Sequence, residues 1–237
     1  YGLFDPEKKV FTPLFGQGEK NHYQAKFGVN EHEIIVLTNA LSEYARLYVF
    51  TAGQFVPLSL SNEKYDVDSF TVQKTRERLL YSVNREGYLV PMVLDLKTRR
   101  EIESPFISKD VTFVEAGLSS TDGRYTILYL EWTNRPSSTV VYDWQTKTSV
   151  PWLRPSAPEV DQSQFVSAKL MHIPVGGAKI PAFVRIPTRC EKSAQPCPVI
   201  VEFHGGPEGQ WRPQFDRTVQ CLSKLGFGIL QPNVRGS

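Results

Sequence analysis

The stretch Pro198-Val-Ile-Val-Glu-Phe-His-Gly-Gly-Pro-Glu-Gly-Gln-Trp211 decides the fold class of the end of this chain. Its first six residues form a short, nearly continuous apolar run, which is typical of a strand covered on both faces of an α/β sheet. The run opens into a glycine-rich loop that begins at His204. Open α/β sheets bind ligands at the carboxyl ends of their strands, so this loop is a candidate site.

A helix and a second strand are expected after this loop. Asp216 can cap a helix that runs to about Leu225, with Gly226 as its stop. The inner side of this helix is expected to carry Val219, Leu222 and Leu225, with Cys221 as a small buried hydrophobe. Another apolar strand, residues 227–231, ends in Pro232-Asn-Val-Arg-Gly-Ser237. Strand, glycine-rich loop, helix and strand together predict an α/β unit.

A hairpin and a linker precede this unit. Two extended runs within Phe165–Pro187 flank the turn Val175–Ala178. In the second run, Ile180, Ala182, Val184 and Ile186 alternate with other residues, which predicts one buried face. Arg154–Gln164 is polar and contains prolines. We therefore expect a first domain at residues 1–155, a linker at 156–164 and a second domain at 165–237.

The first two-thirds of the chain repeat with a period of 44 to 48 residues. Four segments each read as a strand, a polar turn and a second short strand, and they align on Asp5, Thr51, Asp95 and Asp143. A second marker runs in step with the first, in apolar strands that contain Ile35, Leu80 and Ile127. The spacings of this second marker are 45 and 47 residues.

A unit of about four short strands at this period predicts a β-propeller blade. One blade cannot bury both of its faces alone, so several must pack around an axis. The chain supplies three repeats and the tail of an earlier one, whereas propellers usually have at least four blades. Residues 1–155 are therefore expected to be a partial β-propeller in which the chain begins. The alternative is a β-sandwich with chance spacing, which the two markers in step disfavour.

Two segments of the last third resemble a known family. Val199–Gln210, followed by Pro232-Asn-Val-Arg-Gly-Ser237, resembles the start of the catalytic domain in the prolyl oligopeptidase family of serine peptidases. The match is best to its acylaminoacyl-peptidase and dipeptidyl-aminopeptidase-like branch. Ala178–Pro187 also looks like that family's lead-in, although Gly176 and Gly177 stand where Asp-Gly usually forms the turn. The resemblance covers roughly residues 165–237 and implies an α/β-hydrolase domain that begins here, capped by the propeller.

The resemblance also assigns roles to the glycine loop. Acyl transfer builds negative charge on a carbonyl oxygen, which fixed N–H donors stabilise, and His-Gly-Gly loops of lipases serve this purpose. In this branch the second glycine is one donor, which maps to the backbone N–H of Gly206. Other branches have a tyrosine donor at the position of His204, so histidine here favours the backbone route. Gly205, Pro207 and His204 are then substrate-binding residues. Arg235 is expected either to bind a carboxylate of the substrate or, as the simpler interpretation, to form an internal ion pair with a nearby acidic residue.

The catalytic triad is missing from these 237 residues. On an α/β-hydrolase, Ser, Asp and His follow in that order, with Ser in a Gly-x-Ser-x-Gly turn. The chain contains no such motif, and the resemblance places all three residues beyond Ser237. Catalysis would therefore require the remainder of the hydrolase domain. The implied function is hydrolysis of short peptides without a cofactor, with the propeller excluding folded proteins. Aminoacyl, acylaminoacyl, dipeptidyl and prolyl specificities all remain open.

Two other functional classes are compatible with parts of the sequence. One is a non-catalytic propeller scaffold with a degenerate hydrolase domain, and the other is an esterase or lipase, which the propeller repeat argues against.

The net charge is +2, from 27 basic and 25 acidic residues, and the sequence has no basic stripe that would indicate a nucleic-acid partner. The apolar stretches are too short to predict a membrane span. No Cys-x-x-Cys motif or close pair of histidines suggests a metal site. Formation of homo-oligomers stays open.

Three cysteines bear on the cellular compartment. Cys190 and Cys197 flank six polar or small residues, and a bond between them would indicate an oxidising compartment. Two free thiols in a cytosolic loop is the alternative. The spacing favours the bond slightly, and with it an extracytoplasmic or secreted protein.

Overall fold

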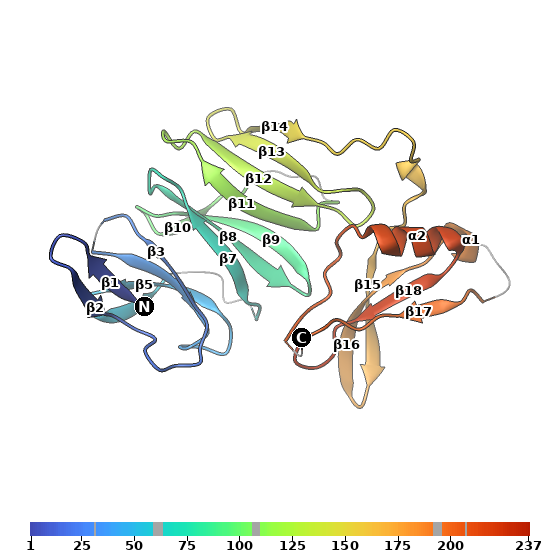
Figure 1. Cartoon of the computed structure of the whole chain (residues 1–237), viewed down its shortest axis with the longest axis horizontal. Helices are drawn as coiled ribbons and strands as arrows, with labels where there is room; N and C mark the ends of the chain where they lie inside the picture. Colours follow the sequence, from blue (N-terminus) through green and yellow to red (C-terminus); the bar gives the residue numbers. More distant parts are fainter. Residues whose placement is uncertain (31, 59–63, 106–109, 192–195, 207) are drawn as a thin grey trace.

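The computed structural model describes residues 1–30, 32–58, 64–105, 110–191, 196–206 and 208–237. Its first strands, β1 (Gly2–Asp5) and β2 (Val10–Pro13), form a hairpin. Three antiparallel four-stranded units follow in chain order (Figure 1). Their strands are β3 (Tyr23–Phe27), β4 (Ile34–Thr38), β5 (Arg46–Thr51), β6 (Gln54–Pro57), β7 (Val67–Val72), β8 (Arg78–Arg85), β9 (Tyr88–Asp95), β10 (Arg100–Ile102), β11 (Phe113–Ser119), β12 (Tyr125–Glu131), β13 (Ser138–Asp143) and β14 (Thr148–Leu153).

These three units are successive blades of a partial β-propeller, as the repeat predicts. We call them blade 1 (β3–β6), blade 2 (β7–β10) and blade 3 (β11–β14). The second sequence marker falls on the second strand of each blade, and the first falls at the turn before the last strand. No helix lies in the described part of residues 1–150. A single parallel pair, Phe113 with Leu89, connects the first strand of blade 3 to β9 of blade 2.

The aspartates of the repeat build the turns between the last two strands. Their side-chain oxygens accept hydrogen bonds from the N–H groups of Glu7, Lys8, Thr98, Gln145 and Thr146. Each turn then closes through a residue with left-handed backbone, and these residues are Lys9, Arg99 and Lys147, with φ of 54°, 55° and 55°. In blade 1 the turn after Thr51 uses Ala52 and Gly53 instead. The repeat is therefore a repeat of turn chemistry.

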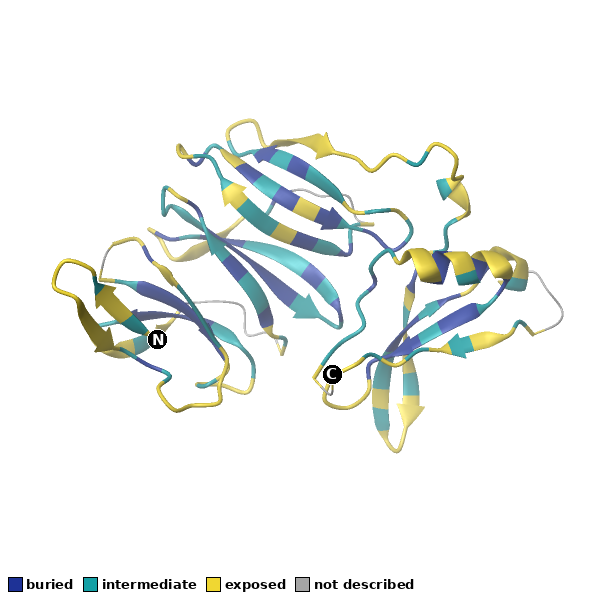
Figure 2. Ribbon diagram, viewed as in Figure 1, coloured by how far each residue is buried: buried dark blue, intermediate teal, exposed yellow. Residues whose placement is uncertain are grey.

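Apolar side chains pack between neighbouring blades, and the strands of the blades carry many buried positions (Figure 2). One cluster joins blades 1 and 2 and includes Leu37, Val49 and Leu79. Another joins blades 2 and 3 and includes Val93 and Leu128, among others. The far face of blade 3 is exposed, and Trp152 there has 72% of its surface accessible. A third cluster packs Phe15 against Ile34, Val36 and Phe50 of blade 1.

A mixed four-stranded sheet follows the blades. Its strands are β15 (Lys169–Val175), β16 (Ala178–Arg185), β17 (Val199–Val201) and β18 (Gly228–Pro232), in the spatial order β15-β16-β18-β17. Strands β17 and β18 are parallel and are connected through α2 (Arg217–Leu225), whereas β16 pairs antiparallel with both of its neighbours. A short 3-10 turn, Gln162–Gln164, lies between β14 and β15. We call residues 165–237 the α/β unit.

Helix α2 begins and ends as expected, but its buried face differs from the prediction. The Asp216 side chain accepts a hydrogen bond from the Val219 N–H at 2.9 Å, and Gly226 ends the helix with φ of 96°. Leu225 is 65% exposed, and Cys221 is exposed as well. Gln220 and Ser223 are buried with Val219 instead. The Gln220 amide is buried because it bonds to the backbone of Thr133 and Val166, residues far away in the sequence.

Two strand predictions also need correction. Strand β17 pairs only with β18 among the described residues, and Val199, Val201 and Phe203 are exposed on it or just after it. The expectation of a strand covered on both faces is therefore wrong for this chain. In β16 the predicted one-sided pattern is also wrong, because Phe183 and Arg185 on the opposite face are fully buried. Phe183 packs edge-on against Tyr88 of blade 2.

A disulfide closes the segment between β16 and β17. Cys190 and Cys197 are bonded, with their Cα atoms 5.8 Å apart. Cys190 belongs to α1 (Thr188–Glu191), and its neighbour Arg189 donates to the Leu225 carbonyl at the end of α2. A cation at this position suits the negative end of the helix dipole. The disulfide therefore fixes a segment that caps the helix.

The turn at Asp143 contributes to the stability of the fold in a way that depends on pH. Arg124 donates to both oxygens of Asp143, with Nη2 2.8 Å from Oδ2, and these hydrogen bonds lower the pKa of Asp143 from 3.8 to about 2. A carboxyl group with a lowered pKa stabilises the fold above its unfolded pKa, and this contribution is lost as pH falls toward the folded value. Asp143→Asn should therefore flatten the fall in stability between pH 4 and pH 2, measured as the urea midpoint.

The control is Glu159→Gln, which removes an exposed carboxylate from the linker. It should leave the slope of the parent chain unchanged. Equal slopes for the parent chain and for Asp143→Asn would contradict the prediction.

Candidate functional site

The carboxyl ends of β17 and β18 lie at the same edge of the sheet, because the two strands are parallel. After β17 the chain enters the glycine loop, which we define as residues 202–211. After β18 it continues into Asn233–Ser237. The His204 Nε2 atom is 2.8 Å from the Ser237 Oγ atom, so the two segments of the resemblance meet in space.

Asn233 holds the end of the glycine loop against β18. It is 3% exposed, its Oδ1 accepts from the Trp211 N–H at 2.7 Å, and its Nδ2 donates to the Trp211 carbonyl at 3.0 Å. The Trp211 indole N–H donates to the Glu202 carbonyl at 2.9 Å, where the loop begins. Both ends of the loop are thus tied together. This role of Asn233 was not predicted from the sequence, although a polar residue directly after an apolar strand is a usable signal.

The glycines expose backbone at this edge. Gly206 has φ of 69°, which disfavours other residues, and its carbonyl accepts from the Gly209 N–H at 3.0 Å. Gly205 and Gly206 are exposed, and a Cβ at either would meet no atom within 4 Å. Within the described backbone, the N–H groups of Gly205 and Gly206 make no hydrogen bond to another backbone group. Pro207, a predicted substrate-binding residue, lies outside the described residues.

Gly209 was not singled out from the sequence, yet it shapes the loop. A Cβ at Gly209 would lie 2.5 Å from the Gly205 carbonyl oxygen and 3.0 Å from the His204 Nδ1 atom. Only glycine fits at that approach. The Nδ1 atom of His204 is buried without a hydrogen-bond partner, so the imidazole bonds through Nε2 to Ser237. His204 therefore packs under the loop and connects it to the segment after β18.

A series of hydrogen-bonded, largely buried polar side chains supports the strand end where the glycine loop begins. Arg185 is 1% exposed, and its guanidinium donates to Gln231 Oε1 at 2.6 Å and to the Gln214 carbonyl at 2.7 Å. Gln231 in turn donates to the Glu202 carboxylate at 2.9 Å. Burial lowers the pKa of Arg185, with Asp216 and Glu202 acting in the opposite direction. The chain links β16, β18 and the end of β17, so it fixes the strands from which the site rises.

Arg235 and Glu208 do not enter this arrangement. Both side chains are exposed, and no ion pair is recorded for Arg235 in the described parts of the chain. No group of three His, Cys, Asp or Glu residues able to hold a metal ion occurs among the residues described. The part of the chain with assigned structure also contains no helix that is long and apolar enough to span a membrane.

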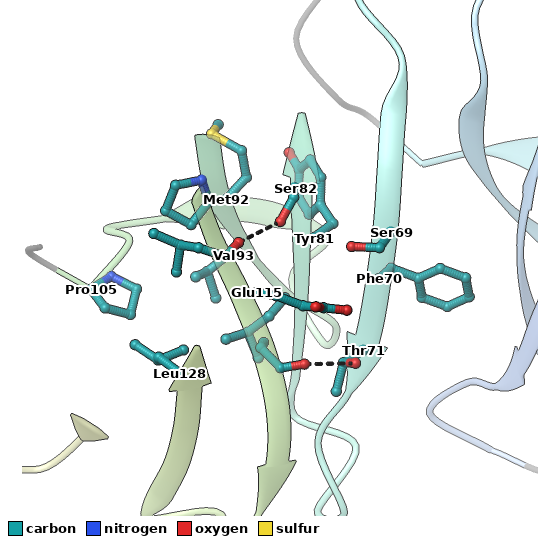
Figure 3. A pocket seen from close by; sticks show the side chains of 14 residues that line it. Ser69, Phe70, Thr71, Tyr81, Ser82, Met92, Val93, Pro105, Glu115 and Leu128 are labelled. Carbon is teal, nitrogen blue, oxygen red and sulfur yellow. Dashed lines mark hydrogen bonds between the residues drawn. The ribbon is translucent and has the colours of Figure 1, made fainter. Parts of the chain in front are cut away.

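A cavity between blades 2 and 3 is too small for a substrate. Ser69, Thr71, Ser82 and Glu115 line it together with apolar side chains (Figure 3). The Ser82 hydroxyl donates to the Val114 carbonyl, and the Thr71 hydroxyl donates to the Ala116 carbonyl. The volume is about 30 Å³, which holds one or two water molecules. This cavity is therefore not a candidate substrate site.

Propeller blades followed by an α/β unit are an arrangement that is also found in solved structures of prolyl oligopeptidase-type peptidases. No protein-family model and no curated protein matches the sequence. Solved structures do match, at 12–17% identity. They include an acylaminoacyl peptidase from Pyrococcus horikoshii, with 17% identity, a TM-score of 0.73, and 100% of this chain and 35% of that one covered.

Two further structures show the same arrangement. Oligopeptidase B from Leishmania major is 15% identical, with a TM-score of 0.78 and coverage of 100% of this chain and 35% of that chain. Prolyl oligopeptidase B from Galerina marginata is 12% identical, with a TM-score of 0.81 and coverage of 96% and 32%. The chain thus spans about a third of the length of the structures it matches, and both its blades and its α/β unit take part in the match.

Loss of the Asn233 side chain should loosen the loop. Asn233→Ala leaves the partly buried N–H and carbonyl of Trp211 without their side-chain partner, and leaving a buried group unsatisfied costs about 1–3 kcal/mol. We expect the free energy of unfolding in urea to fall by that amount. Asn21→Ala, which removes an exposed amide bonded to Glu19, is the control and should change stability by less than about 0.5 kcal/mol. Equal stability of the two variants would contradict the assignment.

Proposed function

We propose that this chain is the segment of a serine peptidase in which the propeller meets the α/β-hydrolase domain, and that the enzyme hydrolyses short peptides. The observation that carries the proposal is the geometry of Gly206. Its left-handed, exposed backbone stands at the carboxyl edge of the sheet, with an N–H that makes no recorded bond among the described residues. A fixed N–H of this kind suits stabilisation of an oxyanion.

The surroundings of the loop support this role. The Asn233–Trp211 pair and the Arg185–Gln231–Glu202 chain hold the loop and its strand in place. Such preorganisation is what makes donors effective during acyl transfer, because no energy is spent on reorienting them in the transition state. The solved structures with this fold carry names of peptidases, namely acylaminoacyl peptidase, oligopeptidase B and prolyl oligopeptidase B.

The nucleophile, the base and the orienting acid would come from the remainder of the hydrolase domain. Strand β17 offers an edge that is unpaired among the described residues, and Val199, Val201 and Phe203 expose apolar surface beside it. Further strands and helices of an α/β sheet would cover this surface. The propeller would then restrict access to the loop, because blade 2 contacts the α/β unit directly beside it.

Labelling with a fluorophosphonate probe tests the proposal. The full-length protein should be labelled at one serine in a Gly-x-Ser-x-Gly turn, whereas residues 1–237 alone should not be labelled. Labelling of the short chain at a serine would contradict our placement of the chemistry. A folded full-length protein that lacks such a serine would favour the non-catalytic scaffold instead.

Substitution of Gly206 should reduce turnover in the full-length enzyme. Gly206→Val forces a β-branched residue into φ of 69° and displaces the N–H, so kcat should fall about 10²- to 10³-fold with a smaller change in KM. Gly18→Val is a matched control, because Gly18 has φ of 76° and similar open space in a turn of the propeller. A similar loss of kcat in both variants would show that strain alone is responsible.

A further inference from the structure

The turn between β8 and β9 of blade 2 reaches into the α/β unit. It consists of residues 84–88, and its side chains contact three different elements there. Asn84 Nδ2 donates to Gln210 Oε1 at 2.8 Å, and Glu86 Oε1 lies 2.7 Å from His172 Nε2 on β15. The Tyr88 ring packs edge-on against Phe183 of β16, with 5.8 Å between ring centroids. We call residues 84–88 the docking turn.

Gly87 lets the docking turn approach closely. Its φ is 94°, and a Cβ there would lie 2.9 Å from the Phe183 ring and 3.2 Å from the Trp211 carbonyl oxygen. Asn84 stabilises the same turn, because its Oδ1 accepts from the Gly87 N–H at 2.9 Å. One asparagine side chain thus shapes the turn with its oxygen and binds the glycine loop with its nitrogen.

Blade contacts continue just beyond the glycine loop. Arg212 forms an ion pair with Asp68 at the start of β7, and both side chains are three-quarters buried. The Thr112 hydroxyl, next to β11, donates to the Pro213 carbonyl at 2.8 Å. Residues 210, 212 and 213 are therefore each bonded to a blade, within seven residues of Gly206.

We propose that Asn84 and Gly87 are positioning residues for the glycine loop, so that blade 2 determines where the Gly206 N–H lies. The propeller would then influence the site in two ways, because it contacts the glycine loop and also limits entry to it. The catalytic consequence rests on the proposed function, whereas the positional claim concerns the loop alone. Neither residue contacts the reacting atoms, since both act through Gln210, Trp211 and Phe183.

Amide hydrogen exchange tests the positional claim without any need for activity. In the full-length protein, Asn84→Ala should raise exchange across residues 202–211 about tenfold, the effect of losing one hydrogen bond of typical strength. Exchange in β4 and β5 of blade 1 should stay unchanged. Gln210→Ala should also raise exchange there, but by no more than Asn84→Ala, which in addition loses the bond to the Gly87 N–H. The double variant should match Asn84→Ala, because the bond between the two side chains is already absent in it.

Two further variants separate positioning from general stability. Gln210→Glu keeps an acceptor for Asn84 and should retain the exchange of the parent protein. Lys97→Ala removes an exposed ion pair with Glu77 elsewhere in blade 2 and should not affect the loop. Unchanged exchange in residues 202–211 of Asn84→Ala, or a uniform rise over the whole chain, would overturn the positional claim.

Kinetics of the full-length enzyme give an independent readout. Asn84→Ala should lower kcat about tenfold while KM changes less, because the loop is less ordered when charge develops. If KM rises and kcat is unchanged, the docking turn affects substrate entry and the catalytic part of the proposal is wrong. A full-length protein without hydrolase activity would refute the proposed function, and the exchange data would still decide the positional claim.

Discussion

A sheet of four short strands cannot keep both of its faces away from water, and this constraint shapes the first 153 residues. Each blade therefore needs a neighbour, and the two largest apolar clusters lie between blades 1 and 2 and between blades 2 and 3. The exposed face of blade 3 shows what an uncovered blade presents to solvent. The strands themselves are too short to be stable without this stacking.

The contact between the blades and the α/β unit is of another kind. It consists largely of hydrogen bonds and ion pairs, such as Asn84 with Gln210 and Asp68 with Arg212, with one aromatic contact at Phe183. Polar interfaces between domains are usually weaker than apolar cores and allow relative motion. The stacking of blades thus gives a rigid platform, while the polar contact places the glycine loop upon it.

The sequence predicted the features that depend on local chemistry. The blades were found because Asp5, Asp95 and Asp143 build the same turn, and the start of α2 was found because Asp216 caps it. The burial of Gln220 and Arg185 was not found, because their partners are distant in the sequence. The exposure of β17 was also missed, since a strand's pattern shows its apolar character and not what covers it. In the site, glycines and His204 could be named, but the bond between Asn233 and Trp211 could not.

Residues 154–168, which include the linker, are the covalent connection between blade 3 and β15. A connection of this length acts as a tether that keeps the two parts at an effective concentration in the millimolar range. An interface worth only about 4 kcal/mol is enough to hold them together at that concentration. Separate chains with the same contacts would drift apart at micromolar concentration. The tether therefore keeps the α/β unit beside its own blades with far fewer contacts than two separate chains would need.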